Sequence, residues 1–195
     1  MNRLFGPIPP TALHIVVDMQ ELFRSHPEWG TQALTGIIPP IQRLLTAKPD
    51  NAWFSRFIPA QRAEHASGTW RRYYHRWHSV TLDQIAPAQI DVVHELQPWA
   101  RRIGDKPGYS ALASAEIRAA AAASGEVILT GVETDVCVLA TAIEAMEMGL
   151  RVILASDALT SSSLPCHAKA LDILHDRFDE QIEVATVDQI LAAWQ

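Results

Sequence analysis

Short apolar runs rich in β-branched residues alternate along this chain with longer segments whose apolar residues recur at helical spacing. The short runs are typical of buried parallel strands, and the longer segments are typical of amphipathic helices. Because Pro39 and Pro40 lie inside the first helical segment, its first turns are expected to form a separate piece. We expect strands at 12–17, 52–57, 92–96, 127–129, 151–157 and 182–186, a further short strand that ends at Lys106, and helices at 34–47, 112–124, 136–148, 166–178 and 187–194.

Strands that alternate with helices in this way indicate a parallel sheet with helices on both of its faces, which is an α/β fold. The length of 195 residues is comfortable for a single core, and no internal repeat divides the chain. We therefore expect one domain over 1–195, with an extended proline-containing arm at 1–10 and an insertion at 57–80.

Composition and charge exclude several classes of protein. The net charge of −6 gives no general attraction to nucleic acid or to an anionic membrane. No apolar run approaches the roughly 18 residues of a membrane span, and the first residues lack the apolar core of a signal peptide. Two cysteines, Cys137 and Cys166, form no disulfide framework. We expect a globular cytoplasmic protein with no nucleic-acid or membrane partner.

Cys137 is the clearest candidate for chemistry. It follows the apolar run at 127–129 and the break at Thr130 and Gly131, and it lies in the first turn of the next predicted helix. The positive end of a helix dipole and free backbone N–H groups favour the thiolate, which is the nucleophilic form of cysteine. Most free cysteines are instead small buried apolar residues. Position alone therefore leaves both interpretations open.

Two charged residues lie at the ends of other predicted strands. Asp18 follows the strand at 12–17, and Lys106 precedes Pro107, which favours extended backbone at the lysine. Taken singly, such an Asp is often a cap or turn residue, and such a Lys is usually a solvated surface charge. The carboxyl ends of parallel strands meet at one edge of the sheet, where ligands bind. Asp18, Lys106 and Cys137 are therefore expected to converge at that edge.

These three side chains have the chemistry of a cysteine hydrolase, which needs a thiolate, a group that moves protons and N–H donors for the oxyanion. Lys106 would add a positive charge that favours the thiolate of Cys137 over its thiol. Such a thiolate would be alkylated near neutral pH well before Cys166. The chain lacks a C-x-x-C pair, a Gly-rich dinucleotide turn, zinc-type Cys/His spacing and a G-x-S-x-G elbow.

The insertion at 57–80 interleaves aromatic and basic residues, most densely from Trp70 to Trp77. Such a mixture occurs on nucleic-acid-binding surfaces, but this segment is short and the chain is acidic. A wall or lid over a pocket and a subunit contact are the favoured interpretations. The simple packing of an irregular insertion is the alternative.

Three motifs give the sequence a close resemblance to the isochorismatase-like cysteine hydrolase superfamily, which includes nicotinamidases, N-carbamoylsarcosine amidohydrolases and ureidoacrylate or biuret amidohydrolases. The first motif is V-V-D-M-Q-E-L-F with Asp18, and the second is D-K-P-G-Y-S-A-L with Lys106. The third and most specific is L-T-G-V-E-T-D-V-C-V-L-A-T-A with Cys137. The resemblance spans about 13–191.

The resemblance implies a three-layer α/β/α sandwich with a mainly parallel six-stranded sheet, and a triad of Asp18, Lys106 and Cys137. In such enzymes the sulfur attacks a carbonyl carbon, the Asp carries the thiol proton to the leaving amine, and water hydrolyses the thioester. The resemblance also implies a cis peptide bond between Val132 and Glu133, which aims the N–H groups of Glu133 and Cys137 at the oxyanion. Members are commonly dimers or tetramers, so a homo-oligomer is expected.

The sequence departs from nicotinamidases after the second strand, where S-R-F-I-P replaces their D-x-H metal motif. We therefore expect no metal and no cofactor. Members that cleave a vinyl ether lack the nucleophilic cysteine, so Cys137 favours hydrolysis of a C–N bond in a small amide, ureido or carbamoyl compound. Phe23, Trp70 and Glu133 are the candidates for contact with the substrate. Two alternatives stay open: an enol-ether hydrolase in which Cys137 is a bystander, and a catalytically idle binding or assembly protein.

Overall fold

Six parallel strands form one sheet in the order β3-β2-β1-β4-β5-β6 in the computed structural model, which describes residues 4–195. The first three residues of the predicted arm lie outside the described residues. The strands are β1 (Leu13–Val17), β2 (Ala52–Phe57), β3 (Ile103–Lys106), β4 (Glu126–Gly131), β5 (Arg151–Leu159) and β6 (Ile182–Ala185). Every neighbouring pair is parallel. The predicted α/β fold is confirmed, with a sheet that is parallel throughout.

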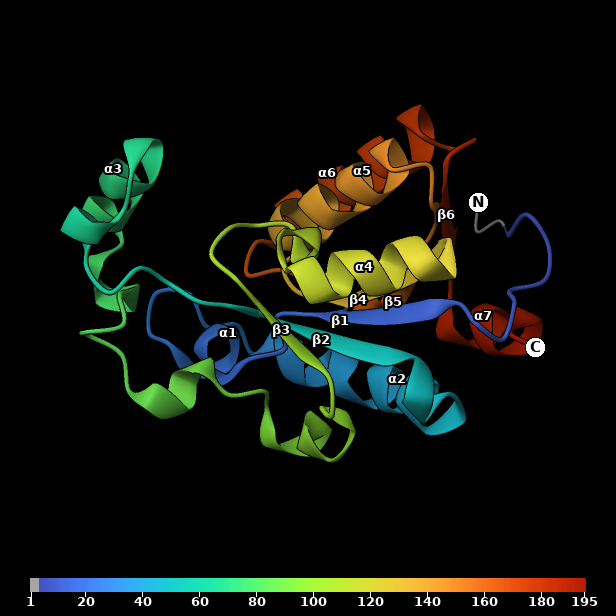
Figure 1. Cartoon of the computed structure of the whole chain (residues 1–195), viewed down its shortest axis with the longest axis horizontal. Helices are drawn as coiled ribbons and strands as arrows, with labels where there is room; N and C mark the ends of the chain where they lie inside the picture. Colours follow the sequence, from blue (N-terminus) through green and yellow to red (C-terminus); the bar gives the residue numbers. More distant parts are fainter. Residues whose placement is uncertain (1–3) are drawn as a thin grey trace.

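Helices cover both faces of this sheet (Figure 1). On one face lie α1 (Glu21–Ser25), α2 (Ala33–Ala47) and α7 (Val187–Ala193), and on the other lie α4 (Ala115–Ser124), α5 (Leu139–Glu147) and α6 (Leu164–Arg177). Alternate side chains of a strand point to opposite faces. Val16 therefore packs in a core with Leu34 of α2, whereas Ile15 and Val17 pack in a second core with Ile117 of α4. No helix within residues 4–195 is long and apolar enough to cross a membrane.

Helix α2 runs without a break through Pro39 and Pro40, so the prediction of a separate first piece is wrong. An interior proline removes a backbone hydrogen bond and costs about 3 kcal/mol. The burial of a large apolar side chain contributes about 1.5–3 kcal/mol, and six such side chains of α2 reach the core, which outweighs the two prolines. They are Leu34, Ile37, Ile38, Ile41, Leu44 and Leu45.

The strand predicted at 92–96 is also wrong. The segment His94–Trp99 is a 3-10 helix, and Val92 makes an isolated antiparallel bridge to Gln20. Val93 and Leu96 are fully buried. They are three residues apart, which is one turn of a 3-10 helix, so both side chains point to the same side. A short apolar run cannot distinguish these by pattern alone. The third strand is β3, which ends at Lys106 as predicted.

The strand order reverses between β1 and β4. The chain moves outward from β1 to β2 and β3, and then returns to begin β4 on the other side of β1. In open parallel sheets, ligands bind in the crevice beyond the carboxyl ends of the strands at such a point. Helix α3 (Gly68–Arg76) projects away from the three layers at this end of the sheet (Figure 1).

The carboxyl ends of β1 and β4 approach so closely that position 131 requires glycine. Gly131 has a φ of 106°, and a Cβ atom there would lie 2.0 Å from the carbonyl oxygen of Val17. That oxygen accepts a hydrogen bond from the Val132 N–H at 3.0 Å. The contact sets how near the turn after β4 lies to the end of β1.

Gly131→Ala is expected to lower the free energy of unfolding by about 3 kcal/mol or more, because backbone strain and a backbone clash act together. Gly125→Ala is the matched control. Gly125 has a φ of 76°, but a Cβ atom there meets nothing within 4 Å, so strain alone should cost about 1–2 kcal/mol. Urea unfolding measures both losses, and equal losses would contradict the close approach at Gly131.

Candidate active site

Asp18, Lys106 and Cys137 meet beyond the carboxyl ends of β1, β3 and β4. The Nζ atom of Lys106 lies 2.8 Å from Oδ2 of Asp18 and 3.6 Å from Sγ of Cys137. The exposed fractions of the three residues are 0%, 1% and 5%. The structure thus gathers in one buried cluster the three residues that sequence patterns select on separate strands.

The Lys106 ammonium is held by groups that accept its protons. Besides Asp18 and the sulfur, it donates to the carbonyl oxygens of Gly108 at 2.9 Å and Tyr109 at 2.7 Å. Burial by itself lowers the pKa of Lys106, but the charge of Asp18 and the hydrogen bonds to Asp18 and Cys137 oppose burial, and the pKa is raised. Lys106 is therefore a fixed positive charge in the cluster.

Asp18 is positioned by the end of β2. The Ser55 hydroxyl donates to Oδ1 of Asp18 at 2.6 Å, and the Asp18 N–H donates to the Ser55 carbonyl at 3.2 Å. The φ of Asp18 is 49°, in the left-handed region that Asp tolerates better than most residues. Two residues later, Gln20 accepts from the Phe57 N–H at 2.7 Å and donates to the Phe57 carbonyl at 3.1 Å. The D-x-Q sequence therefore joins the end of β1 to the end of β2.

Cys137 lies in a single π-helical turn, Thr134–Val138, that leads into α5. The Val138 N–H donates to the Glu133 carbonyl, five residues earlier, at 3.1 Å. The Cys137 carbonyl accepts from the Thr141 hydroxyl at 2.7 Å. A helix does begin where the pattern predicts it, but its first turn is wider than an α-helical turn. Such turns are frequent at functional sites.

A second loop supports this turn. The N–H and the hydroxyl of Thr134 both donate to the Thr160 carbonyl at 3.0 Å. His167 Nδ1 lies 2.8 Å from the Thr134 hydroxyl oxygen. Because the single hydroxyl proton already points to Thr160, Nδ1 must be the donor, which fixes the tautomer of a neutral His167. The Val132–Glu133 peptide bond, where the turn starts, is cis.

The resting form of Cys137 is the thiol. Burial raises the pKa of Cys137 well above its usual range and the charge of Asp18 raises it further, while Lys106 opposes both. This corrects the expectation of a thiolate favoured by Lys106 and the helix start. The ammonium is already paired with Asp18, and a dry site disfavours one more negative charge. Cys137 is thus a thiol beside a carboxylate that can accept its proton.

A cavity of about 260 Å³ opens onto Cys137. Phe23 and Glu133, two of the predicted substrate contacts, are part of its wall. The cavity is lined by Phe23, Glu28, Trp29, Phe57, Tyr73, Trp77, Tyr109, Glu133, Val136, Cys137 and Ser162. A small molecule that filled this space would lie directly against the sulfur.

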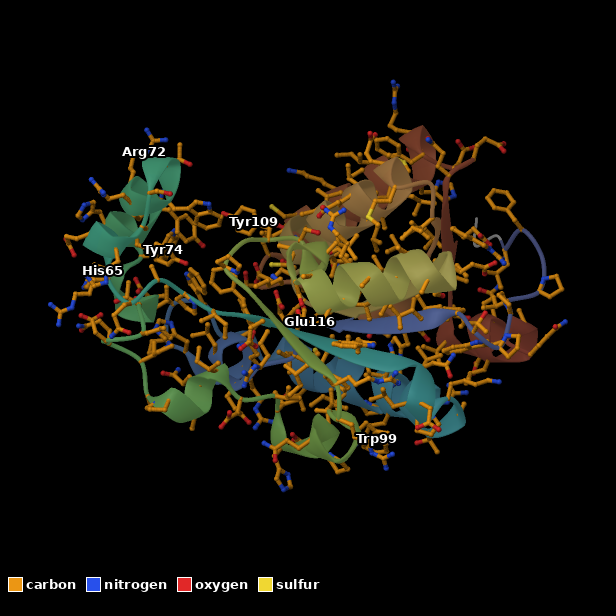
Figure 2. The ribbon with its side chains drawn as sticks, in the orientation of Figure 1. His65, Arg72, Tyr74, Trp99, Tyr109 and Glu116 are labelled. Carbon is orange, nitrogen blue, oxygen red and sulfur yellow. The ribbon has the colours of Figure 1, made fainter. Side chains whose placement is uncertain are left out.

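Trp70 is not among the lining residues of this cavity but lines a neighbouring surface depression, and its contact with the substrate stays a prediction. Its ring packs behind the wall, with its centroid 5.2 Å from that of Tyr73 and 5.0 Å from that of Tyr109. Tyr73 and Trp77 are the side chains of the aromatic–basic segment that reach the cavity. Figure 2 shows Tyr109 on the loop after β3, on the side nearer α3. The interpretation of this segment as a wall therefore holds for Tyr73 and Trp77.

Several residues of the site were not singled out by the sequence, and Ser55, Trp29 and Glu28 are among them. Ser55 lies one position beyond the last β1–β2 register pair, Val16 with Phe54, so a prediction of strand register would have placed it beside Asp18. Trp29 lies in a segment without periodicity, and no local pattern pointed to it. Its ring centroid nevertheless lies about 6 Å from those of Phe23, Phe57, Tyr73 and Trp77, which form the centre of the wall.

The parallel α/β sheet and the cluster of Asp18, Lys106 and Cys137 match the expectations from the sequence motifs. A comparison with family models points to the same family. The family model described as the isochorismatase domain matches residues 12–186. The chain belongs to the isochorismatase family.

Solved structures share the fold over nearly the whole chain. The cysteine hydrolase of Pseudomonas syringae pv. phaseolicola is 25% identical, with a TM-score of 0.79 over 99% of this chain and 96% of that one. The N-carbamoylsarcosine amidase of Thermoplasma acidophilum is 18% identical, with a TM-score of 0.71 over 93% and 97%. The uncharacterized isochorismatase family protein PncA of Bacillus subtilis is 35% identical over 91 residues, which cover 46% of this chain and 49%, about half, of that relative.

The raised pKa of Cys137 gives a prediction for Asp18→Asn. Loss of the negative charge removes one cause of the increase while Lys106 stays, so the pKa of Cys137 falls and more thiolate forms at pH 7. Alkylation of Cys137 by iodoacetamide should accelerate by about tenfold or more, one pKa unit being one decade of thiolate. Peptide mass mapping measures the rate, with Cys166 in the same sample as the reference. Slower alkylation of Cys137 in the variant would contradict the assigned cause.

The ion pair gives a second prediction. Lys106→Met leaves the Asp18 carboxylate buried without its cation and should lower the free energy of unfolding by about 3–5 kcal/mol. The double variant Asp18→Asn/Lys106→Met carries no buried charge at these positions and should recover much of that loss. Urea unfolding of both single variants and the double variant measures the coupling. Additive losses would show that the two side chains do not stabilise one another.

Proposed function

We propose that this protein is a cysteine hydrolase that cleaves a C–N bond of a small amide, ureido or carbamoyl compound through a thioester intermediate. One observation carries the proposal. A thiol, a carboxylate and an ammonium ion, each almost fully buried, meet in one cluster, and the thiol lines a cavity of small-molecule size. Membership of the isochorismatase family and the likeness to a cysteine hydrolase over the whole chain support it.

Asp18 carries the proton in this mechanism, Cys137 is the nucleophile and Lys106 is the electrostatic partner. As Sγ attacks the carbonyl carbon, the thiol proton passes to the Asp18 carboxylate and the carbonyl becomes a tetrahedral oxyanion. Asp18 then protonates the leaving nitrogen, the C–N bond breaks and a thioester remains. Water attacks the thioester, Asp18 accepts its proton, and the carbon–sulfur bond breaks. The proton returns to sulfur, which restores the thiol and releases the acid.

We assign the oxyanion to the backbone N–H groups of Glu133 and Cys137. The turn already uses the N–H groups of Thr134, Val136 and Val138, which donate to carbonyl oxygens of the protein. A preorganised pair of donors is commonly worth about 3 kcal/mol or more of transition-state stabilisation. Lys106 keeps the cluster electrically balanced while the negative charge moves from Asp18 to the oxyanion.

We propose that the reaction needs no metal ion. The residues after the middle of β2, where nicotinamidases carry D-x-H, are used differently here: Ser55 donates to Asp18, and Arg56 pairs with Asp105 at 2.8 Å. Ser55, Arg56 and Phe57 thus offer neither the carboxylate nor the imidazole with which that motif ligates a metal. The cytoplasmic location and assembly into dimers or tetramers that the resemblance implies stay predictions.

Turnover of a panel of small primary amides and ureido compounds, followed by release of ammonia or amine, tests the proposal. Cys137→Ala should reduce turnover by more than about a thousandfold. Cys166→Ala is the matched control and should keep wild-type turnover. Asp18→Asn should also be inactive although its thiol is more readily alkylated, because it cannot carry the proton to the leaving nitrogen. Mass spectrometry of wild-type enzyme quenched with substrate should show an acyl group on Cys137.

Two results would contradict these roles. Equal turnover by wild type and Cys137→Ala would exclude the nucleophile. Loss of activity in Asp18→Asn with full activity in Cys137→Ala would favour the enol-ether hydrolase in which Cys137 is a bystander.

A further inference from the structure

The charged groups on the cavity wall are all of one sign. Glu28 and Glu133 line the cavity, and its lining residues include no Lys, Arg or His. Neither carboxylate forms an ion pair with a basic side chain within residues 4–195: Glu28 accepts from the Ser79 hydroxyl, and Glu133 accepts from the Ser162 N–H at 2.9 Å. Behind Cys137, the charge of Lys106 is balanced by Asp18 at 2.8 Å, and neither residue lines the cavity. The cavity therefore has an uncompensated negative charge.

The rest of the wall is mainly aromatic, with side chains brought from four separate segments of the chain. They are Phe23, Trp29, Phe57, Tyr73, Trp77 and Tyr109. Aromatic faces attract cations, most strongly where water is excluded. The Nζ atom of Lys106 already lies over the Phe57 ring, 5.3 Å from its centroid. A wall of rings with two carboxylates is the chemistry that recognises an alkylated ammonium group.

We propose that the substrate of this site carries a positively charged, alkylated nitrogen, which the aromatic wall and the carboxylates of Glu28 and Glu133 bind while its carbonyl carbon faces Cys137. This inference rests on the proposed hydrolysis for the reaction, but the recognition itself does not require turnover. Such a substrate is an amide or carbamoyl compound with a quaternary or tertiary ammonium group a short distance from the scissile bond.

Arg72 and Arg76 of α3 do not reverse this preference. Both are exposed and line a neighbouring surface depression, not the cavity. The guanidinium of Arg76 lies 5.0 Å from the centroid of the Trp77 ring. An anionic substrate would meet the carboxylates of the wall once it left the surface for the cavity.

Three amides of nearly the same size test the proposal by isothermal titration calorimetry on Cys137→Ala, which cannot consume them. Trimethylammonioacetamide carries the cation, 3,3-dimethylbutanamide replaces its nitrogen by carbon, and malonamate carries an anion. The cation should bind about tenfold or more tighter than the neutral isostere, which corresponds to a typical gain from cation–π and charge contacts. Malonamate should bind most weakly.

Variants of the two wall carboxylates test the effect of their charge separately from any effect on folding. In the Cys137→Ala background, Glu28→Gln and Glu133→Gln keep an acceptor for their hydrogen bonds but lose the charge. Each should reduce the preference for the cation over its neutral isostere by about threefold or more. Glu64→Gln makes the same chemical change at an exposed position outside the cavity and should leave the preference unchanged. Thermal melting confirms that each variant is folded.

Equal or tighter binding of the neutral isostere, tighter binding of malonamate, or no detectable binding of the cation would overturn the proposal. So would a preference for the cation that survives Glu28→Gln and Glu133→Gln together. Turnover by the wild-type enzyme separates the two levels of inference. A cation that binds selectively but is not hydrolysed supports the recognition and counts against the proposed reaction, whereas preferred hydrolysis of the neutral amide does the reverse.

Discussion

The burial of one ammonium group is the constraint on which the rest of this structure depends. Moving a Lys side chain out of water costs several kcal/mol unless its charge and all its protons are matched. Lys106 ends an edge strand, and its partner Asp18 ends a strand two positions away in the sheet. The ion pair therefore spans the end of β2, from which Ser55 reaches Asp18. The ammonium of Lys106 therefore links the ends of β1, β2 and β3.

The same dry environment determines the protonation state of Cys137. A thiolate beside a buried carboxylate would place two negative charges near one ammonium, so Cys137 keeps its proton until a carbonyl arrives to share the charge. In the proposed reaction, activation is a proton transfer from Cys137 to Asp18 and does not require a preformed thiolate. The π-helical turn and its contacts to Thr160 and His167 hold the sulfur in place for that transfer.

Patterns in the sequence predict the parts of the fold that depend on local periodicity. The strands that contain Ile15, Phe54 and Ile153 lie where apolar runs predict them, and Lys106 ends its strand as the following proline indicates. The patterns fail where tertiary packing decides the outcome. The core holds α2 together through Pro39 and Pro40, and His94–Trp99 forms a 3-10 helix from an apolar run that looks like a strand. The convergence of the three site residues follows from strand order, but the protonation of Cys137 depends on burial, which no spacing of residues reports. Tyr73 and Trp77 line the cavity and Trp70 does not, which depends on the face that α3 turns toward the cavity.

Helix α3 stands apart from the three layers (Figure 1). The candidate catalytic groups are anchored to the sheet, whereas Tyr73 and Trp77 of the cavity wall come from this outlying part of the chain. Natural variation can therefore remodel what the enzyme accepts without disturbing the central strands. With this division, substitutions in α3 can change which substrates are bound while the residues at the ends of the strands stay the same.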